Sequence, residues 1–137
     1  MWPLYALLAS VTAAIMTIVG KIGLKGVDST LATGVRSLFM FLFMAIVVVA
    51  TGKLKGLDQI HRSALIAIII SAVFGALSWL FYFLALRDGS ASRVSAIDRT
   101  SVVFVIVLST LFLAEKLTWK LAVGGLLVAA GAILVAI

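Results

Sequence analysis

The chain has 137 residues, of which 64% are hydrophobic and 12% are charged, and its mean hydropathy is +1.31. A soluble domain of this size would have to expose most of its apolar surface, so the composition predicts an integral membrane protein. The net charge of +6 does not indicate nucleic-acid binding, because the eleven Lys and Arg residues are scattered between apolar runs. With no Cys and one His, the sequence predicts neither a disulfide framework nor a metal site, and no cofactor is expected.

The first two apolar stretches are each long enough to cross a bilayer as a helix. Residues 3–20 carry no charge, and their small side chains recur at steps of three and four, which suits close helix packing. A short glycine-bearing loop follows, and either Ser29 or Thr30 is the predicted N-cap of the second span, residues 31–51. Arg36 lies early in that span, where it either extends to the lipid headgroups or has a functional role.

A polar loop separates the second span from the third, residues 63–86. In the third span Ser78 and Tyr82 share one helix face, and Trp79 lies beside them. Trp79 is about 10 Å inside the end of the span, which is deeper than an interfacial aromatic residue requires. This face therefore predicts a polar and aromatic wall within the membrane.

The predicted fourth span, residues 91–114, holds the side chains least compatible with hydrocarbon. In a continuous helix Asp98 and Arg99 would lie roughly 10–12 Å deep. A charge at a helix centre costs about 2.5–3.5 kcal/mol on insertion scales, so both side chains should face protein or water. Ser95 and Ser101 belong with Asp98 to one polar arc of this helix.

The predicted fifth span, residues 119–137, begins after Thr118, which can cap it, with Trp119 as an interfacial anchor. Small residues form one face of this span and predict a helix-association surface that consists of Gly125, Ala129, Ala132 and Ala136. Five spans joined by short loops define an all-α polytopic membrane protein. Because five is odd, the two termini should lie on opposite sides of the membrane.

Basic residues near the span ends do not select one orientation in the membrane. With Arg36 and Arg99 set aside as intramembrane residues, one side carries five basic residues and the other carries four. The two groups are Lys53, Lys55, Arg62, Lys116 and Lys120 on one side, and Lys21, Lys25, Arg87 and Arg93 on the other. Counting the two internal arginines reverses the small bias.

Several short motifs occur in an order and spacing that resembles the drug/metabolite transporter superfamily, and specifically a single EamA-type unit over residues 1–137. They are GKIGL at the end of the first span, Arg36 in the second, ALRDGSAS leading into the fourth, FLAEKLT at its end and GGLLVAAGAILVAI in the fifth. FLAEKLT is similar to the family element FLGERLT, with Ala114 in place of Gly and Lys116 in place of Arg. Two features depart from the family. Val102 stands where many members have Pro, which removes an expected kink in the fourth helix, and the chain has one five-helix unit where most members have two.

The resemblance implies one half of a ten-helix fold, and secondary export of small organic metabolites or drugs by alternating access around a cavity lined by the first four helices. The residues expected to form the pathway are Arg36, Ser78, Trp79, Tyr82, Ser95, Asp98, Arg99 and Ser101. Of these, Arg36, Trp79, Tyr82, Asp98 and Arg99 should lie in one layer of the membrane. Two-unit relatives carry inverted repeats, so a single unit predicts an antiparallel homodimer, or a heterodimer with a paralogue, in the plasma (inner) membrane. The proton is the hypothetical coupling ion, carried by Asp98. Arg36 and Arg99 are its candidate charged partners, and Arg36, on a neighbouring helix, is the better placed of the two.

Two other interpretations stay open at this point. The intramembrane charges could form a structural ion pair that fixes helix packing. The protein could also be a non-transporting structural or regulatory subunit of a larger membrane complex. A membrane enzyme is disfavoured, because Asp98 and Arg99 point about 100° apart on a helix and no base is placed to activate a serine.

Overall fold

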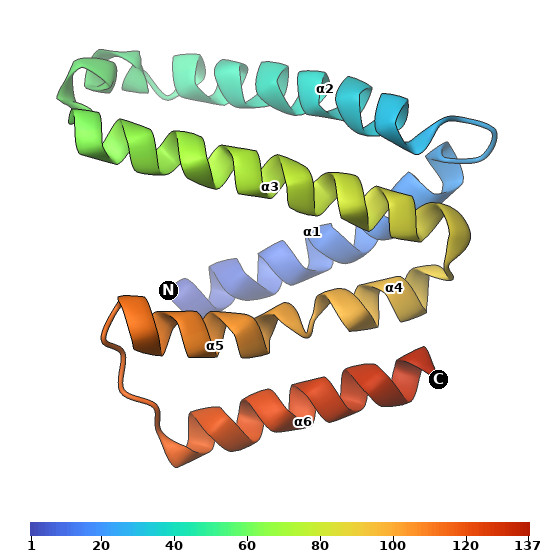
Figure 1. Cartoon of the computed structure of the whole chain (residues 1–137). Helices are drawn as coiled ribbons and strands as arrows, with labels where there is room; N and C mark the ends of the chain where they lie inside the picture. The colour runs from blue at the N-terminus through green and yellow to red at the C-terminus, as the bar shows by residue number, and fades with distance from the viewer. The chain divides into compact units, whose positions relative to one another are not determined.

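The computed structural model describes all 137 residues, and it is helical throughout, without a β-strand. The elements in chain order are α1 (Trp2–Gly23), α2 (Ser29–Ala50), the 3₁₀ helix η1 (Lys53–Gln59), α3 (Arg62–Asp88), α4 (Ala91–Asp98), α5 (Ser101–Phe112) and α6 (Trp119–Ala136) (Figure 1). Five segments are long and apolar enough to cross a membrane, since α4 and α5 together make one of them. The predicted all-α fold with five spans is confirmed.

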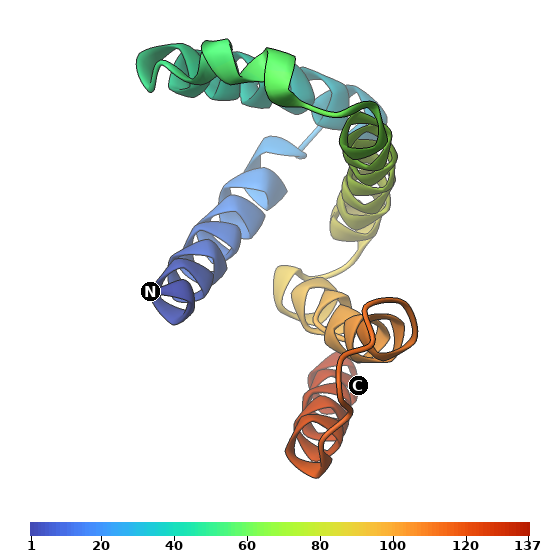
Figure 2. The same ribbon diagram turned by 90° about the vertical axis from the view of Figure 1, so that its left-hand side faces the viewer.

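The chain divides into two compact units, which we describe one at a time. One unit comprises residues 1–21 and 88–137, and therefore most of α1 together with α4, α5 and α6. In it, α6 packs along both α4 and α5, beside which it lies in two views (Figures 1 and 2). The other unit, residues 22–87, contains α2 and α3, which run antiparallel and are connected through η1 (Figure 1).

The apolar side chains of the spans are largely exposed. In no span is more than 11% of the most apolar stretch buried within the protein. Phe41, Phe74 and Leu126, for example, are 68%, 67% and 71% exposed. Soluble monomers rarely expose contiguous apolar patches of more than a few hundred Å², so these helix faces are suited to lipid or to another chain.

Hydroxyl side chains inside the spans donate hydrogen bonds to carbonyl groups one turn earlier. Thr17 Oγ1 donates to Ala13 O at 2.9 Å, Thr33 Oγ1 to Ser29 O at 2.7 Å, and Ser37 Oγ to Thr33 O at 2.8 Å. Hydrocarbon offers no hydrogen-bonding partner, so these internal bonds make the polar side chains compatible with a membrane.

Side-chain caps begin two of the spans. At α2 the cap is Asp28, which accepts a hydrogen bond from Leu31 N at 2.9 Å. The prediction of Ser29 or Thr30 was therefore wrong, because the helix begins at Ser29, two residues before the predicted start of the span, and a carboxylate is available just before it. At α6, Thr118 Oγ1 accepts from the backbone N–H three residues later at 3.2 Å, as predicted.

The fourth span is interrupted, whereas the sequence predicted one helix over residues 91–114. Helix α4 ends at Asp98 and α5 begins at Ser101. Between them Arg99 has φ −67° and ψ −13°, and Thr100 has φ −63° and ψ −17°, values close to those of a 3₁₀ turn. The intramembrane charged pair thus lies at the junction of two shorter helices.

The hydrogen bonds around Thr100 have the spacing of a 3₁₀ turn. Its backbone N–H donates to Ile97 O at 2.9 Å, and its Oγ1 donates to the same carbonyl at 2.7 Å. Val103 N–H in turn donates to Thr100 O at 2.9 Å, so the bonds here span three residues instead of four. The span is therefore interrupted near Val102 although the family's proline is absent, and the expectation that Val102 removes a kink stays a prediction.

The turn after α5 passes through Ala114, the one non-glycine residue with positive φ, at 55°. This conformation allows Glu115 N–H to donate to Ser109 O at 3.3 Å, which satisfies a carbonyl near the helix end. A left-handed conformation costs a residue that has a Cβ about 1–2 kcal/mol, and glycine avoids this cost. Ala114 is the position at which the similar element FLGERLT has its glycine.

Ala114→Gly is expected to stabilise the protein by roughly 0.5–1 kcal/mol. The relief of about 1–2 kcal/mol of backbone strain exceeds the about 0.4–1 kcal/mol that glycine adds to the entropy of the unfolded chain. Thermal or SDS-induced unfolding of the purified protein in detergent measures the change. As the control, Ala130→Gly on the exposed side of α6 should lower stability by about 1 kcal/mol, since glycine there only weakens a helix. A loss of stability in both variants would contradict strain at Ala114.

Candidate solute site

Arg36 on α2 places its guanidinium group over aromatic rings of α3. Its Cζ atom lies 3.1 Å from the ring centroid of Trp79 and 5.0 Å from that of Phe83. Both distances are inside the range of about 6 Å over which a cation and a ring face attract each other. Such a contact contributes about 2 kcal/mol when it is shielded from water. It therefore favours an arrangement in which the Arg36 side chain packs against α3, compared with one in which it extends to the lipid headgroups.

The rings near Arg36 belong to a group of three aromatic side chains on one face of α3. Trp79 and Phe83 stack with 6.5 Å between centroids and 11° between planes, and Tyr82 meets Phe83 edge-on at 6.2 Å and 62°. Phe83 is only 3% exposed, which fixes the position of the group. Spacings of three and four residues bring these side chains together on a helix. We refer to Arg36, Trp79, Tyr82 and Phe83 as the arginine–aromatic cluster.

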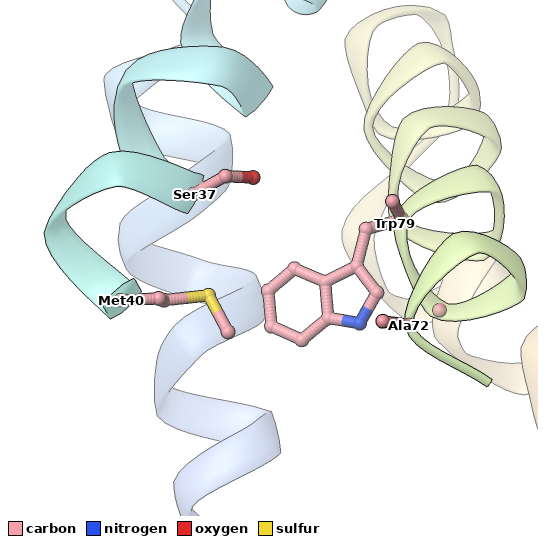
Figure 3. Close-up of a pocket in the computed structure, with 6 residues that line it drawn as sticks. Ser37, Met40, Ala72 and Trp79 are labelled. Carbon is pink, nitrogen blue, oxygen red and sulfur yellow. The ribbon is translucent and has the colours of Figure 1, made fainter. Parts of the chain in front are cut away.

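A cavity of about 270 Å³ lies between α2 and α3 next to this cluster (Figure 3). In Figure 3 the indole of Trp79 extends from α3 toward Met40 of α2. Trp79 therefore belongs to both features, as a wall of the cavity and as the ring that contacts Arg36. The short side chains on α3 leave the space open. The complete lining is Ser37, Met40, Ala72, Gly75, Ala76 and Trp79.

No charged residue lines the cavity, and Arg36 contacts one residue of the lining, Trp79. Helix α2 contains no acidic residue. Asp28 precedes α2 and caps it, and Asp58 lies in η1, which follows the other end of the same helix.

The structure brings together three of the predicted pathway residues, Arg36, Trp79 and Tyr82. Ser78 is exposed and does not line the cavity. The remaining four residues belong to the other unit. Ser95 and Asp98 are half-buried there, and Arg99 and Ser101 are exposed. A pathway formed by all eight residues, five of them in one membrane layer, stays a prediction.

Sequence reasoning did not identify most of the cavity lining. The residues missed were Ser37, Met40, Ala72, Gly75 and Ala76, together with Phe83 as a contact of Arg36. A signal for part of this set exists in the sequence, because small residues recur at steps of three and four before Trp79. That spacing places them on the same face of α3 as the indole.

The predicted helix-association surface of α6 makes contacts within the chain. Gly125 and Ala132 are buried, and Ala129 and Ala136 are half-buried. A Cβ atom added at Gly125 would lie 2.8 Å from Cδ1 of Ile106 on α5. The absence of a side chain here lets α6 approach α5 closely. A role of this surface between two chains stays a prediction.

Gly125→Leu is expected to lower protomer stability by about 1–3 kcal/mol, since a larger side chain must displace Ile106. Gly124→Leu is the matched control, because a Cβ there meets nothing within 4 Å. Unfolding of both variants in detergent, together with cross-linking in membranes, measures the two effects. If Gly125→Leu keeps wild-type protomer stability but loses cross-linked dimer, the surface acts between chains instead.

The five apolar spans define a polytopic helical membrane protein, and a concave, mostly apolar cavity lies between two of them. Sequence comparison identifies the family, since the model of the EamA-like transporter family matches residues 1–137. The chain belongs to this family, which confirms the resemblance noted in its motifs. It is similar to the protein "Uncharacterized transporter in cobO 3'region" of Sinorhizobium sp, with 35% identity over 136 residues that cover 99% of this chain and 96% of that protein. No solved structure matches the chain.

Proposed function

We propose that this protein is a secondary transporter that exports small organic metabolites or drugs across the plasma (inner) membrane by alternating access. Membership of a transporter family supports transport, and the cavity beside Arg36 and Trp79 is the observation that carries the proposal of a solute site. Arg36 is about 10 Å from the start of α2, which begins at Ser29. A solute bound here would lie inside the membrane span, as transport by alternating access requires.

In this proposal the working unit is an antiparallel homodimer or a heterodimer with a paralogue. A five-helix chain supplies half of a ten-helix transporter, and a second chain in the opposite orientation would rebuild an inverted repeat. The exposed apolar faces of the spans support a partner, and the nearly balanced basic residues support insertion in both directions.

The orientation of single cysteines tests the antiparallel arrangement. The protein has no Cys, so Lys25→Cys, between α1 and α2, and Lys55→Cys, in η1, each give one label site. An impermeant maleimide applied to intact cells should label about half of the molecules of each variant, because both orientations occur in the dimer. Labelling of only one of the two variants would overturn the homodimer, and the heterodimer would then require a partner of opposite orientation.

Transport itself is tested with the purified protein in liposomes that hold an imposed pH gradient. The probe is a mixture of small organic acids, amines and neutral compounds, and mass spectrometry measures what accumulates. We expect at least one compound to accumulate until the gradient is dissipated, since the proposed coupling ion is the proton. Accumulation of none would overturn the proposal in favour of a non-transporting structural or regulatory subunit.

A further inference from the structure

We propose that the connection between α2 and α3 is a lipid-binding surface that lies in the membrane interface and prefers acidic phospholipid headgroups. Three features carry this proposal: the place of the connection in the fold, a row of exposed apolar side chains, and the basic residues beside that row. The proposal depends on the five-span fold and is independent of the proposed transport. We call this surface the η1 face, and it consists of Lys53, Leu54, Lys55, Leu57, Ile60 and Arg62.

The position of η1 in the chain keeps it at a membrane surface. Helix α2 ends at Ala50 and α3 begins at Arg62, and both are spans, so residues 51–61 connect them at one surface of the bilayer. The seven residues of η1, at about 2.0 Å each, give a length of about 14 Å. Packed helices lie about 8–10 Å apart, so η1 is long enough to connect the two spans while it lies in the interface.

The backbone turns sharply where α2 ends, and this turn keeps η1 beside the span. Gly52 has φ 68° and ψ 15°, a left-handed conformation that glycine adopts without strain. Thr51 N–H donates to Val47 O at 2.9 Å and Gly52 N–H donates to Val49 O at 3.0 Å, so the last carbonyls of α2 are satisfied before the chain turns. After the turn η1 packs against α2, at one end of the α2–α3 hairpin (Figure 1).

Three apolar side chains of the connection form a row. A 3₁₀ helix has three residues per turn, so Leu54 and Leu57 lie above one another on the same side of η1. Ile60 follows at the same spacing, and its N–H donates to Leu57 O at 3.2 Å. The three side chains are 48%, 58% and 39% exposed. At the bilayer surface such a row can insert between lipids and leave water, as the apolar side of an interfacial helix does.

Basic residues lie beside this row. At about 120° per residue, Lys53 and Lys55 belong to the two other sides of η1, one on each side of the leucines. These side chains and that of Arg62 form no hydrogen bond or ion pair within the protein. Three basic residues and one acidic residue, Asp58, give residues 52–62 a net charge of +2. Acidic headgroups complement this charge, and each Lys or Arg near an acidic surface strengthens attachment roughly fivefold.

Quenching of a fluorescent label tests whether the row lies in lipid. The protein has no Cys, so Leu57→Cys places a bimane label in the row, and Gln59→Cys places one on another side of η1. The full chain is studied in phosphatidylcholine liposomes, with iodide on both sides of the membrane as the aqueous quencher. The lipid quencher is phosphatidylcholine with a spin label on the acyl chain close to the headgroup.

We expect iodide to quench the label at position 57 at least about threefold less than the label at position 59, because an inserted row is shielded from water. The spin-labelled lipid should give the opposite order. Leu54→Cys provides a second label site in the row if Leu57→Cys does not insert. Equal quenching by iodide at the two positions would overturn the proposal. Protection of position 57 from both quenchers would place protein instead of lipid on the row and would also overturn it.

Headgroup preference is tested with two quencher lipids that share one spin-labelled acyl chain, a phosphatidylglycerol and a phosphatidylcholine, each in the same low amount. We expect the phosphatidylglycerol to quench the label at position 57 at least about threefold more, because Lys53 and Lys55 attract its charge. In about 1 M salt the ratio should approach one, since the Debye length is then about 3 Å instead of about 10 Å at 0.1 M. Lys53→Gln with Lys55→Gln should remove the preference, and Lys53→Arg with Lys55→Arg should keep it.

The matched control removes the same charge from another connection. Lys116→Gln with Lys120→Gln, at exposed positions around the start of α6, should keep the preference measured at position 57. An equal loss in this control would assign the preference to the overall charge of the protein and overturn the role of η1. A ratio near one in low salt for the wild-type basic residues would overturn the headgroup preference. These measurements need no solute, so failure of the proposed transport would leave their outcome unchanged.

Discussion

Replacing Trp79 with Ala is expected to slow solute transport on the order of 30-fold. The substitution removes the ring that holds the Arg36 guanidinium, a contact of about 2 kcal/mol when shielded from water, and each 1.4 kcal/mol corresponds to a factor of ten in affinity. It also opens one wall of the cavity. Initial uptake rates into liposomes, for a solute that the wild-type protein transports and at matched protein content, measure this effect.

Two further variants make this measurement specific. Trp79→Phe keeps a smaller aromatic face over which a cation can lie, so its rate should be intermediate. Trp119→Ala removes a tryptophan that is 82% exposed at the start of α6 and should change the rate little. An equal loss in Trp119→Ala would attribute the effect to membrane insertion instead of to the arginine–aromatic cluster.

Asp98→Asn is expected to abolish transport driven by a proton gradient while the protein still inserts and folds. The carboxylate is half-buried at the last residue of α4, inside the fourth span, and asparagine keeps its shape but cannot exchange a proton. Uptake into liposomes, measured with and without an imposed pH gradient, separates coupling from solute binding. The variant should show the same rate in both conditions.

Leu111→Ala is the control for this prediction. Leu111 is 71% exposed on α5, in the same span, so its truncation should leave the response to the gradient intact. If Asp98→Asn instead keeps the wild-type pH dependence, Asp98 serves helix packing, and proton coupling must be assigned to another residue.

The spans themselves could be predicted from sequence because they depend on one strong property, the length of uncharged apolar runs. Their exact starts depend on single hydrogen bonds. Thr118 was recognised as a cap, whereas Asp28 was missed because adjacent Ser29 and Thr30 are equally good candidates by residue type. Backbone geometry at the helix start, which no composition rule contains, selects Asp28.

The interruption of the fourth span could not be predicted in the same way. Neither Arg99 nor Thr100 is a residue type that ends a helix, and apolar residues follow directly after them. The proline that many family members have near this position is absent. At the interruption both the Thr100 hydroxyl and its backbone N–H bond the carbonyl of Ile97. Threonines with a similar side-chain bond also lie inside the uninterrupted helices α1 and α2, so the residue type alone does not predict this turn.

For the candidate site, the sequence indicated Arg36 and Trp79 but not the contact between them. An arginine near the end of a span can extend to the headgroups or pack inward, and the sequence alone is compatible with both arrangements. The cavity was harder to predict, since its volume is the space left between two helices. Small residues such as Gly75 permit such a space, but they also occur where helices pack closely, as Gly125 does against Ile106.

The 3₁₀ turn between α4 and α5 also changes the rotational phase of the fourth span. Each residue advances about 120° around the axis in a 3₁₀ helix and about 100° in an α-helix, so the two residues of the turn rotate α5 by about 40° relative to a continuation of α4. With these values Ser101 lies about 20° from Asp98 around the axis, instead of about 60° in a continuous α-helix, so the turn brings these two polar residues closer to one face. Positions for labels or substitutions on α5 should be chosen from a helical wheel that begins at Ser101.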